Sequence, residues 1–550
     1  MSKIKKYLNE NNNKLNIKDY ITILVIVILY GVFSFINLGS NICPNTFYNI
    51  HMNEELLFEF NNTFDISKIK TFSGNYGSYY KVYSSVDGEE YNEVFEINNS
   101  CFTWKEDNIN TYGKYIKFVF TKESSLGEVY FYDNLNRIEN INIKDYYGDN
   151  IYTLDDELNT NPKKISYLNS SYFDEVFFAR SAYEYANNLQ AFEWTHPPLG
   201  KIIQAIPLFI THHLSTFNYR FMGNISGILM LVIMYLFGIE LFKKRKFAIT
   251  SSLIIALDTF HFAQTRMGTV DSHLVLFIIT SSYFMIRFIN SNKIGYLFLS
   301  GLFFSLSCSI KWTGLYVGIA LCILYFYYMF KNKLFNIKYI SYGFMFFIVL
   351  PLIIYCSSFL LFPNNYYYTN NLKNIYEEQK VMYNFHSNLK EDHTFSSKWY
   401  TWPISYKPVW YYSEEYNNTR GTITGVGNLV IWWFGIIAFI YSIIMLIIKK
   451  KKINKNILIL IIFILSLLLP YMFIKRVMFL YHYFPVLPFV MLITVNMFYD
   501  LDKKNKLKLL LPEYLILSLL FFIIFYPVVS GLEVSSNYID KLNLFSEWHF

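Results

Sequence analysis

Residues 428–474 read NLVIWWFGIIAFIYSIIMLIIKKKKINKNILILIIFILSLLLPYMFI, two apolar runs separated by a run of lysines. The apolar runs, 428–448 and 456–474, each match the ~20 residues that an α-helix needs to cross a bilayer. Short lysine-rich loops such as 449–456 stay on the cytoplasmic side of a membrane. This stretch therefore predicts two transmembrane helices joined in the cytoplasm.

The rest of the chain repeats this pattern. Of its 550 residues, 53% are hydrophobic and 16% are charged, whereas a soluble domain has roughly a quarter of its residues charged. We therefore predict a polytopic α-helical membrane protein with about eleven spans. The further spans are expected at 19–39, 220–242, 247–265, 270–289, 294–310, 312–330, 337–361, 477–499 and 511–531.

Lysine and arginine predict how the spans are oriented. The start of the chain is basic, and the first span lacks a small-residue cleavage site, which indicates an anchor rather than a removed signal peptide. A path that begins in the cytoplasm leaves every basic loop inside, as the positive-inside rule requires. These loops explain the net charge of +7, so a nucleic-acid partner is not expected. They are 243–246, 290–293, 331–338, 449–456 and 502–508.

The same path leaves 40–219 and 362–427 outside the cytoplasm. In 42–160, aromatic and polar residues alternate between Gly and Asp-Gly turns, which predicts β-strands. We expect 1–41 to hold the cytoplasmic N-terminus and the first transmembrane helix. The remainder, 161–550, forms the main transmembrane domain and includes the outer loop 362–427.

Parts of the segment 42–160 resemble discoidin-like, galactose-binding β-sandwich modules. The resemblance implies an extracytoplasmic β-sandwich insertion that either binds sugar or protein or serves as a passive spacer. It is carried by YKVYSSVDGEEYNEV (80–94), Trp104, KYIKFVF (114–120) and GEVYFYD (127–133).

Polar residues that are costly inside a membrane gather at the outer ends of the predicted spans. Arg266 and Lys311 are isolated cations on the outer side, contrary to the positive-inside rule. Asp174 and Glu175 begin a predicted helix before the second span, where adjacent acids also serve as helix caps. The other candidates on this rim are Arg220, Asp271, His386, His393, Tyr481 and His482.

Residues 192–201, FEWTHPPLGK, also come just before the second span. Their two prolines restrict the backbone ahead of the membrane. We expect the loop to hold His196 and Lys201 over an outward cavity, although a rigid turn without such a role is the alternative. Several cations with a few carboxylates fit an anionic substrate carried by a lipid, because Arg binds phosphate oxygens in pairs and Lys acts as a point charge.

The sequence contains neither a set of residues with metal-ligand spacing nor a Gly-rich nucleotide loop. We therefore expect no metal and no other cofactor.

Six motifs resemble the protein O-mannosyltransferase family and cover about 166–500. The resemblance implies a GT-C fold, a polyprenyl-phosphate sugar as lipid donor, a secreted or membrane protein as acceptor, and contacts with membrane lipids. Family members often act as dimers. The motifs are FDEVFFA (173–179), THPPLGK (195–201), YRFMGNISG (219–227), TRMGTVDSHLVLF (265–277), KWTGLY (311–316) and LYHYFPVLPF (480–489).

The resemblance also implies roles for single residues. Asp174 matches the catalytic base, with Glu175 as its acidic neighbour. Arg220 and Lys311 match basic positions that hold the carrier phosphate. The other matched positions are implied to bind donor or substrate: Arg266, Asp271, His196, Lys201, Tyr481 and His482.

Three departures from the family pattern leave the reaction class intact but open the choice of acceptor. Phe177 stands where the family usually has a histidine after the Asp-Glu-Val run. The loop 362–427 is too short for the MIR module of eukaryotic members. The segment 42–160 is additional.

We therefore expect an inverting, metal-independent membrane glycosyltransferase that moves mannose from polyprenyl phosphate to Ser or Thr hydroxyls of secreted proteins at the outer membrane face. The alternative is the same fold moving another hexose or pentose to a glycolipid or cell-wall polymer. A transporter or a sugar-sensing receptor built on the β-module is a further, disfavoured alternative. A transporter would carry polar residues at mid-bilayer and repeated halves, whereas here the polar residues lie at the rim and no repeat is visible. Abundant Asn, Lys, Ile, Tyr and Phe indicate an AT-rich genome and a bacterial plasma membrane.

Overall fold

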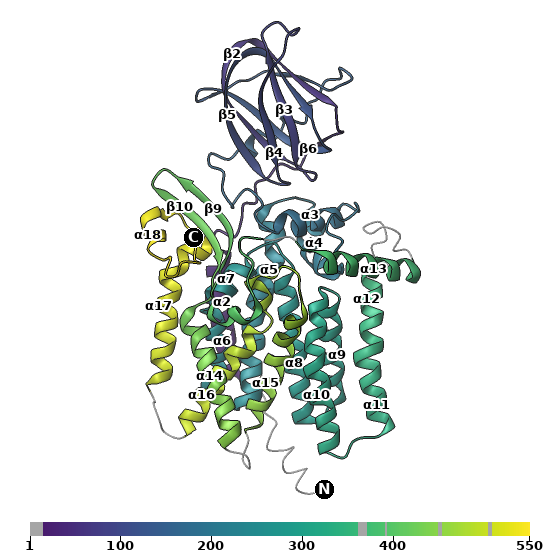
Figure 1. The fold of residues 1–550 in the computed structure, drawn as a ribbon, viewed down its shortest axis with the longest axis vertical. Coiled ribbons are helices and arrows are strands. Elements are labelled where there is room, and N and C mark those ends of the chain that lie inside the picture. Colours follow the sequence, from purple (N-terminus) through teal and green to yellow (C-terminus); the bar gives the residue numbers. More distant parts are fainter. Residues whose placement is uncertain (1–14, 361–370, 391–392, 449–453, 504–508) are drawn as a thin grey trace. The chain divides into compact units, whose positions relative to one another are not determined.

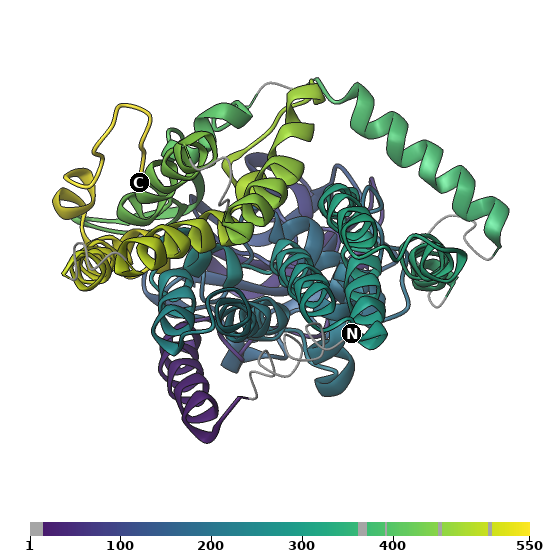
Figure 2. The ribbon, with the colours of Figure 1, turned by 90° about the horizontal axis from the view of Figure 1, so that it is seen from below.

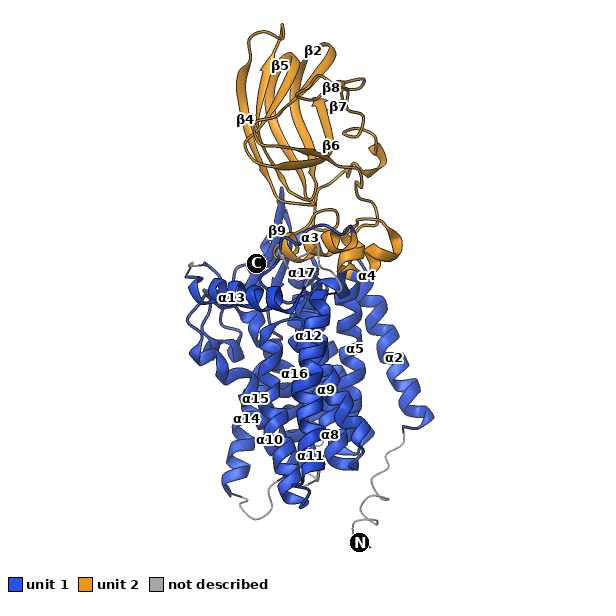
Figure 3. Ribbon diagram, turned by 90° about the vertical axis from the view of Figure 1, so that its right-hand side faces the viewer, with its two compact units in different colours: residues 1–36, 187–204, 221–550 blue, residues 37–186, 205–220 orange. Residues whose placement is uncertain are grey.

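The computed structural model describes residues 15–360, 371–390, 393–448, 454–503 and 509–550. It divides into two compact units (Figure 3). Unit 1 comprises 1–36, 187–204 and 221–550, and unit 2 comprises 37–186 and 205–220. Parts of the predicted cytoplasmic and outer segments lie outside the described residues, namely 1–14, 361–370, 391–392, 449–453 and 504–508.

Unit 1 is built mainly of apolar helices that run side by side (Figures 1 and 2). Helices suit a membrane because they satisfy every backbone N–H and C=O group within one segment. The helices are α2 (Ile17–Phe35), α5 (Thr216–Phe242, which starts in unit 2), α6 (Arg245–Ala256), α7 (Thr259–Thr265), α8 (Asp271–Ser291), α9 (Ile294–Cys308), α10 (Leu315–Lys331), α11 (Ile337–Phe344), α12 (Leu350–Leu360), α14 (Leu429–Ile448), α15 (Lys455–Leu468), α16 (Leu487–Lys503), α17 (Leu510–Ser530) and the short α18 (Ser536–Asp540).

Among the described residues, eight helical segments are long and apolar enough to cross a membrane, with α11 and α12 counted together. The bent pair α6 and α7 makes a ninth if it is one span. The other two predicted spans, 294–310 and 477–499, fall on α9 and α16, which have 15 and 17 residues. The polytopic helical architecture is confirmed, and the count of eleven stays a prediction.

The predicted span 247–265 is not one straight helix, because α6 and α7 are bent by 62° where they meet. Asp258 explains the break. Its side chain accepts the backbone N–H of His261 and so caps the start of α7. It also accepts the indole N–H of Trp432 at 2.8 Å. Hydropathy alone does not reveal such a cap.

The chain between α12 and α14 forms several small elements. A helix, α13 (Leu372–Asn388), runs across the direction of the neighbouring helices (Figures 1 and 2). After it come the 3-10 helix η5 (Trp399–Ile404) and the hairpin β9 (Val409–Tyr416) and β10 (Thr419–Gly425). The short β11 (Val534–Ser535) pairs with β10 and completes a three-stranded antiparallel sheet.

Unit 2 contains an eight-stranded antiparallel sheet in the order β1-β6-β2-β5-β3-β4, with β7 beside β6 and β8 beside β2. The long β2 pairs with β5, with β8 near its start and with β6 near its end. The strands are β1 (Tyr48–Ile50), β2 (Glu55–Ser73), β3 (Ser78–Ser85), β4 (Asn92–Asn99), β5 (Trp104–Phe120), β6 (Ser124–Asp133), β7 (Asn136–Arg137) and β8 (Asn142–Lys144).

Alternate residues of these strands form a buried aromatic and aliphatic core that includes Phe58, Tyr80, Phe118 and Phe131. The predicted β-rich insertion is thus confirmed. The compact unit is larger than the predicted 42–160, since it also contains 161–186, with α3 (Glu175–Ala186), and 205–220. The likeness to discoidin modules stays a prediction.

Candidate functional site

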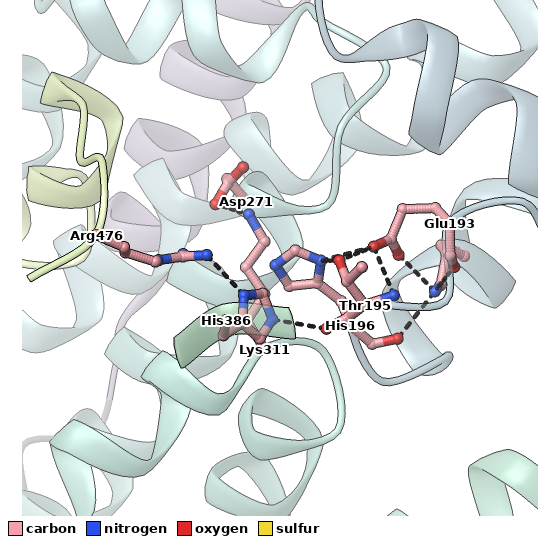
Figure 4. A network of polar contacts seen from close by, with 8 residues as sticks. Glu193, Thr195, His196, Asp271, Lys311, His386 and Arg476 are labelled. Carbon is pink, nitrogen blue, oxygen red and sulfur yellow. Dashed lines mark hydrogen bonds and ion pairs between the residues drawn. The ribbon is translucent and has the colours of Figure 1, made fainter. Parts of the chain in front are cut away.

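The proline-rich loop of unit 1 is folded around the carboxylate of Glu193 (Figure 4). This carboxylate accepts the N–H of Thr195 at 3.0 Å and Nδ1–H of His196 at 2.9 Å. It also pairs with Nζ of Lys201 at 2.7 Å. Burial by itself raises the pKa of Glu193, but the charge of Lys201 and the hydrogen bonds from Lys201 and His196 outweigh burial and hold the pKa below its ordinary value. The carboxylate is therefore ionised.

Lys201 holds this loop together. Its side chain is fully buried, and Nζ donates to the backbone oxygens of Glu193 and His196 as well as to the Glu193 carboxylate. An ammonium group has three N–H donors, so all three have an acceptor within the loop. The role of Lys201 in binding substrate stays a prediction that this geometry does not favour.

Gly200 allows the loop to lie against two other segments. A Cβ atom at this position would lie 2.8 Å from Cβ of Val270 and 3.0 Å from Cγ2 of Ile310. Asp271 follows Val270 and begins α8, and Lys311 follows Ile310. The close approach at Gly200, at the start of α4 (Leu199–Thr211), therefore brings three motifs together. They are THPPLGK, TRMGTVDSHLVLF and KWTGLY.

Lys311 and Asp271 form an ion pair of 2.8 Å between Nζ and Oδ1, and both side chains are largely buried. The pair lies near the proline-rich loop (Figure 4). Burial lowers the pKa of His196, and the charge of Lys311 lowers it further. His196 is therefore neutral at pH 7, and because its Nδ1–H donates to Glu193, Nε2 carries the lone pair.

His386, on α13, joins the proline-rich loop to Arg476. Nη1 of Arg476 donates to Nδ1 of His386 at 2.6 Å, and Nε2 of His386 donates to the carbonyl of Thr195 at 2.8 Å (Figure 4). The rings of His386 and His196 are 5.3 Å apart between centroids. Burial lowers the pKa of His386 to about 4. The bridging ring is therefore neutral.

His482 lies in the 3-10 helix η7 (Leu480–Tyr483), ahead of α16. Its ring stacks on Tyr481 at 4.7 Å and on Trp402 at 5.9 Å between centroids. Nδ1 of His482 lies 3.0 Å from the carbonyl oxygen of Phe479. Whether His482 or Tyr481 binds donor or substrate stays a prediction.

Two other predicted residues occupy different places. Nη2 of Arg266 donates to the carbonyl of Ile36 at 2.7 Å, and the guanidinium lies 4.7 Å from the ring centre of Phe262. The rings of His393 and Phe479 are in contact, with 5.0 Å between their centroids. Whether either residue binds substrate stays a prediction.

In unit 2, Arg220 is fully buried and all of its donors are used. Nε and Nη2 donate to the two carboxylate oxygens of Glu175, each at 2.7 Å. The remaining N–H groups donate to the carbonyls of Leu38, Tyr167 and Ser170 at 2.7 to 3.1 Å. A guanidinium has five N–H groups, so none is left for a phosphate.

Asp174 directly precedes α3, and its carbonyl accepts the N–H groups of Phe177 and Phe178 at 3.1 and 3.0 Å. Phe173 before it has a φ of +48°, which is unusual for a bulky residue and marks a tight change of direction. Asp174 is half-buried. Its role as the base stays a prediction.

The sequence reasoning did not single out three residues that the structure adds. Glu193 lies inside the quoted decapeptide, three positions before His196. Arg476 stands on the predicted outer side, so the positive-inside argument used for Arg266 and Lys311 identifies it as well. Glu378, buried on α13, has no comparable signal beyond its place on the apolar side of an amphipathic helix.

Two models of one protein family match most of unit 1. "Dolichyl-phosphate-mannose-protein mannosyltransferase" matches residues 195–355, and "C-terminal four TMM region of protein-O-mannosyltransferase" matches residues 371–548. The chain belongs to the protein O-mannosyltransferase family. The two matches include His196, Lys311 and Arg476, whereas Asp174 and Glu175 precede them.

Relatives and solved structures of this O-mannosyltransferase family resemble the chain at low identity. The polyprenol-phosphate-mannose–protein mannosyltransferase of Mycolicibacterium smegmatis is 21% identical over 300 residues, which are 44% of this chain and 58% of the relative. The dolichyl-phosphate-mannose–protein mannosyltransferase 4 of Saccharomyces cerevisiae is 29% identical over 142 residues, which are 23% of this chain and 18% of the relative. The chain thus spans less than two thirds of the length of these relatives.

A structure of the S. cerevisiae protein O-mannosyltransferase Pmt1-Pmt2 complex bound to the sugar donor matches with a TM-score of 0.62 and 14% identity. The match covers 69% of this chain and 89% of the yeast chain. This likeness shows the fold, and the predicted GT-C architecture is confirmed.

Proposed function

We propose that this family member is a membrane glycosyltransferase that moves mannose from a polyprenyl-phosphate donor to Ser or Thr hydroxyls of secreted or membrane proteins. The observation that carries the proposal is the convergence of Lys311, Asp271, His196, His386 and Arg476 on the proline-rich loop of unit 1. Relatives named for this donor class and this acceptor class support it.

Lys311 is the proposed ligand of the donor phosphate. When the bond between C1 of mannose and the phosphate oxygen breaks, the bonding electrons leave with the phosphate, and negative charge grows there. A positioned ammonium group stabilises that charge. Asp271 holds Nζ in place through the 2.8 Å ion pair. The reaction as proposed has no step that requires a metal.

Asp174 is the proposed base. The acceptor hydroxyl attacks C1 of mannose on the face opposite the phosphate, and Asp174 takes the hydroxyl proton. Attack from that face inverts the anomeric configuration. Arg220 is assigned a positioning role instead of the implied phosphate role, because its five N–H groups are used inside unit 2. It holds Glu175 and the start of α3 next to Asp174.

The distribution of lysines between the spans supports an active site on the outer face of the membrane, and a bacterial plasma membrane is the expected location. The yeast relative of known structure is a complex of two such proteins, which supports a dimer as the working assembly.

Comparing wild type with Asp174→Asn tests the assignment of the base. Membranes containing each full chain receive polyprenyl-phosphate [³H]mannose and a Ser/Thr-rich peptide. Wild type should label the peptide and Asp174→Asn should not, while Asp87→Asn, on an exposed turn of unit 2, should behave as wild type. Transfer that survives Asp174→Asn would assign the base elsewhere. Label that appears only in glycolipid would favour a lipid acceptor instead.

A further inference from the structure

We propose that Arg476 is a second ligand of the donor phosphate, beside Lys311. This inference rests on the proposed function and concerns the same site. Arg476 lies between α15 and α16, and its side chain is half-buried. In Figure 4 its guanidinium points toward His386 and the Lys311–Asp271 pair.

Most of this guanidinium has no acceptor among the residues that the structure describes. Of its five N–H groups, the structure describes one hydrogen bond, from Nη1 to Nδ1 of His386. Within the described part of the chain, no carboxylate forms an ion pair with Arg476. Six other arginines each have such a partner: Arg137, Arg180, Arg220, Arg245, Arg287 and Arg420. Arg476 is a half-buried cation that no described carboxylate neutralises.

His386, the described hydrogen-bond partner of Arg476, carries no charge. An arginine can only donate, so Nδ1 of His386 must accept. The carbonyl of Thr195 can only accept, so Nε2 of His386 must donate. An imidazole with one lone pair and one N–H is neutral. His386 therefore orients the guanidinium without compensating its charge.

The charges of the cluster leave Arg476 in excess. Lys311 pairs with Asp271, and Lys201 pairs with Glu193. The charges of these two pairs cancel. The carboxyl of Glu378 adds little negative charge, because burial raises its pKa to about 7. Among the described residues of the cluster, the further cation is Arg476. Partial burial of an uncompensated charge is costly. A bound anion would remove that cost.

A glycosyl phosphate fits this surplus charge. The donor is a phosphodiester with one negative charge and two free oxygens, which a guanidinium can bind in pairs. The product phosphate gains a second negative charge as the C1–O bond breaks, so the interaction strengthens along the reaction. His386, which accepts the hydrogen bond from Arg476, has its ring 5.3 Å from the ring of His196 between centroids, so the guanidinium lies beside the proline-rich loop.

The test compares Arg476→Met with Lys475→Met in purified full-length protein. Lys475 is the adjacent cation and is exposed, which makes it a matched control. Thermal unfolding is followed with undecaprenyl phosphate and with undecaprenol, which lacks the phosphate. Wild type and Lys475→Met should be stabilised more by the phosphate, and Arg476→Met should lose this preference. The KM for the mannosyl donor should rise at least tenfold in Arg476→Met only.

A phosphate preference that persists in Arg476→Met would overturn the inference and leave the proposed function standing. Conversely, an Arg476-dependent preference in a wild type that transfers no mannose would support the phosphate site while the proposed function fails. If Arg476→Met does not fold, Arg476→Lys replaces it. That variant keeps the charge but loses the paired donors, so the phosphate preference should shrink, and an unchanged preference would overturn the inference.

Discussion

The ammonium group of Lys311 lies 2.8 Å from a carboxylate oxygen of Asp271, and the two side chains are 13% and 11% exposed. One residue precedes η2 (Trp312–Gly314), and the other begins α8. Low exposure limits screening by water, so the interaction is stronger than in a surface pair. Asp271 thereby fixes Nζ beside the proline-rich loop, where the proposed donor phosphate binds.

Lys311→Met should lower kcat/KM for mannose transfer about 100-fold, as loss of one charge-stabilising group does in other enzymes. Steady-state transfer assays at varied donor concentration measure this. Lys407→Met is the control, since Lys407 forms an ion pair with Glu547 at 3.3 Å outside the site, and it should change kcat/KM less than twofold. Equal effects of the two substitutions would rule out a special role for Lys311.

Arg220→Met should destabilise the fold, because it leaves the buried carboxylate of Glu175 without its partner. Breaking a buried ion pair by removing one member costs about 3–5 kcal/mol. The melting temperature of the purified protein measures this, with Arg137→Met, from the more exposed pair with Glu139, as control. A variant that folds with unchanged stability but no longer binds polyprenyl phosphate would restore the phosphate role of Arg220.

Glu378→Gln should raise the melting temperature at pH 8 and leave it nearly unchanged at pH 5. Burial raises the pKa of Glu378 to about 7 from an ordinary value of 4.5. The folded protein thus keeps this proton while the unfolded chain releases it, and the stability present at low pH is lost as the pH rises toward 7. Glutamine removes the loss because it carries no charge.

Glu377→Gln is the matched control for this pH dependence. Glu377 is the preceding residue, is 53% exposed and pairs with Lys380 at 3.0 Å. Its substitution should leave the melting temperature nearly constant at both pH values. Parallel changes in the two variants would show that the pH dependence of stability does not come from the buried carboxyl of Glu378.

Gly200→Ala should destabilise the fold by about 1–3 kcal/mol, because the added methyl group overpacks a tight contact. It should also raise the donor KM, since the methyl group would push the proline-rich loop away from Val270 and Ile310. Gly295→Ala is the control. A methyl group added at Gly295 would meet no described atom outside its own helix turn within 4 Å, and alanine in a helix should be neutral or slightly stabilising. Similar losses in both variants would count against the close approach at Gly200.

Hydropathy and charge were sufficient to predict the main architecture. The runs that flank 449–456 became α14 and α15, and the alternating pattern of 42–160 became a sheet with a buried core. The bend at Asp258 was missed, because a polar cap inside an apolar run requires partners such as Trp432 that are distant in sequence.

The site was predicted in part. Motifs brought Lys311, Asp271 and His196 into one set, and the structure places them together (Figure 4). The partners of a cation cannot be read from sequence, so Arg220 was expected to face a phosphate although it is enclosed by carbonyls and Glu175. Arg476 is the opposite case. The sequence analysis did not single it out, and the described contacts show that few of its N–H donors are used.

The most direct measurement is mannose transfer by the wild-type protein. Purified protein in lipid vesicles is supplied with polyprenyl-phosphate [³H]mannose and a Ser/Thr-rich peptide, and the label on the peptide is tested for release by alkaline β-elimination. We predict labelled peptide whose mannose is released by base and is α-linked if the donor is β-linked. Labelled lipid without labelled peptide, or mannose that keeps the donor's anomeric configuration, would contradict the proposed reaction.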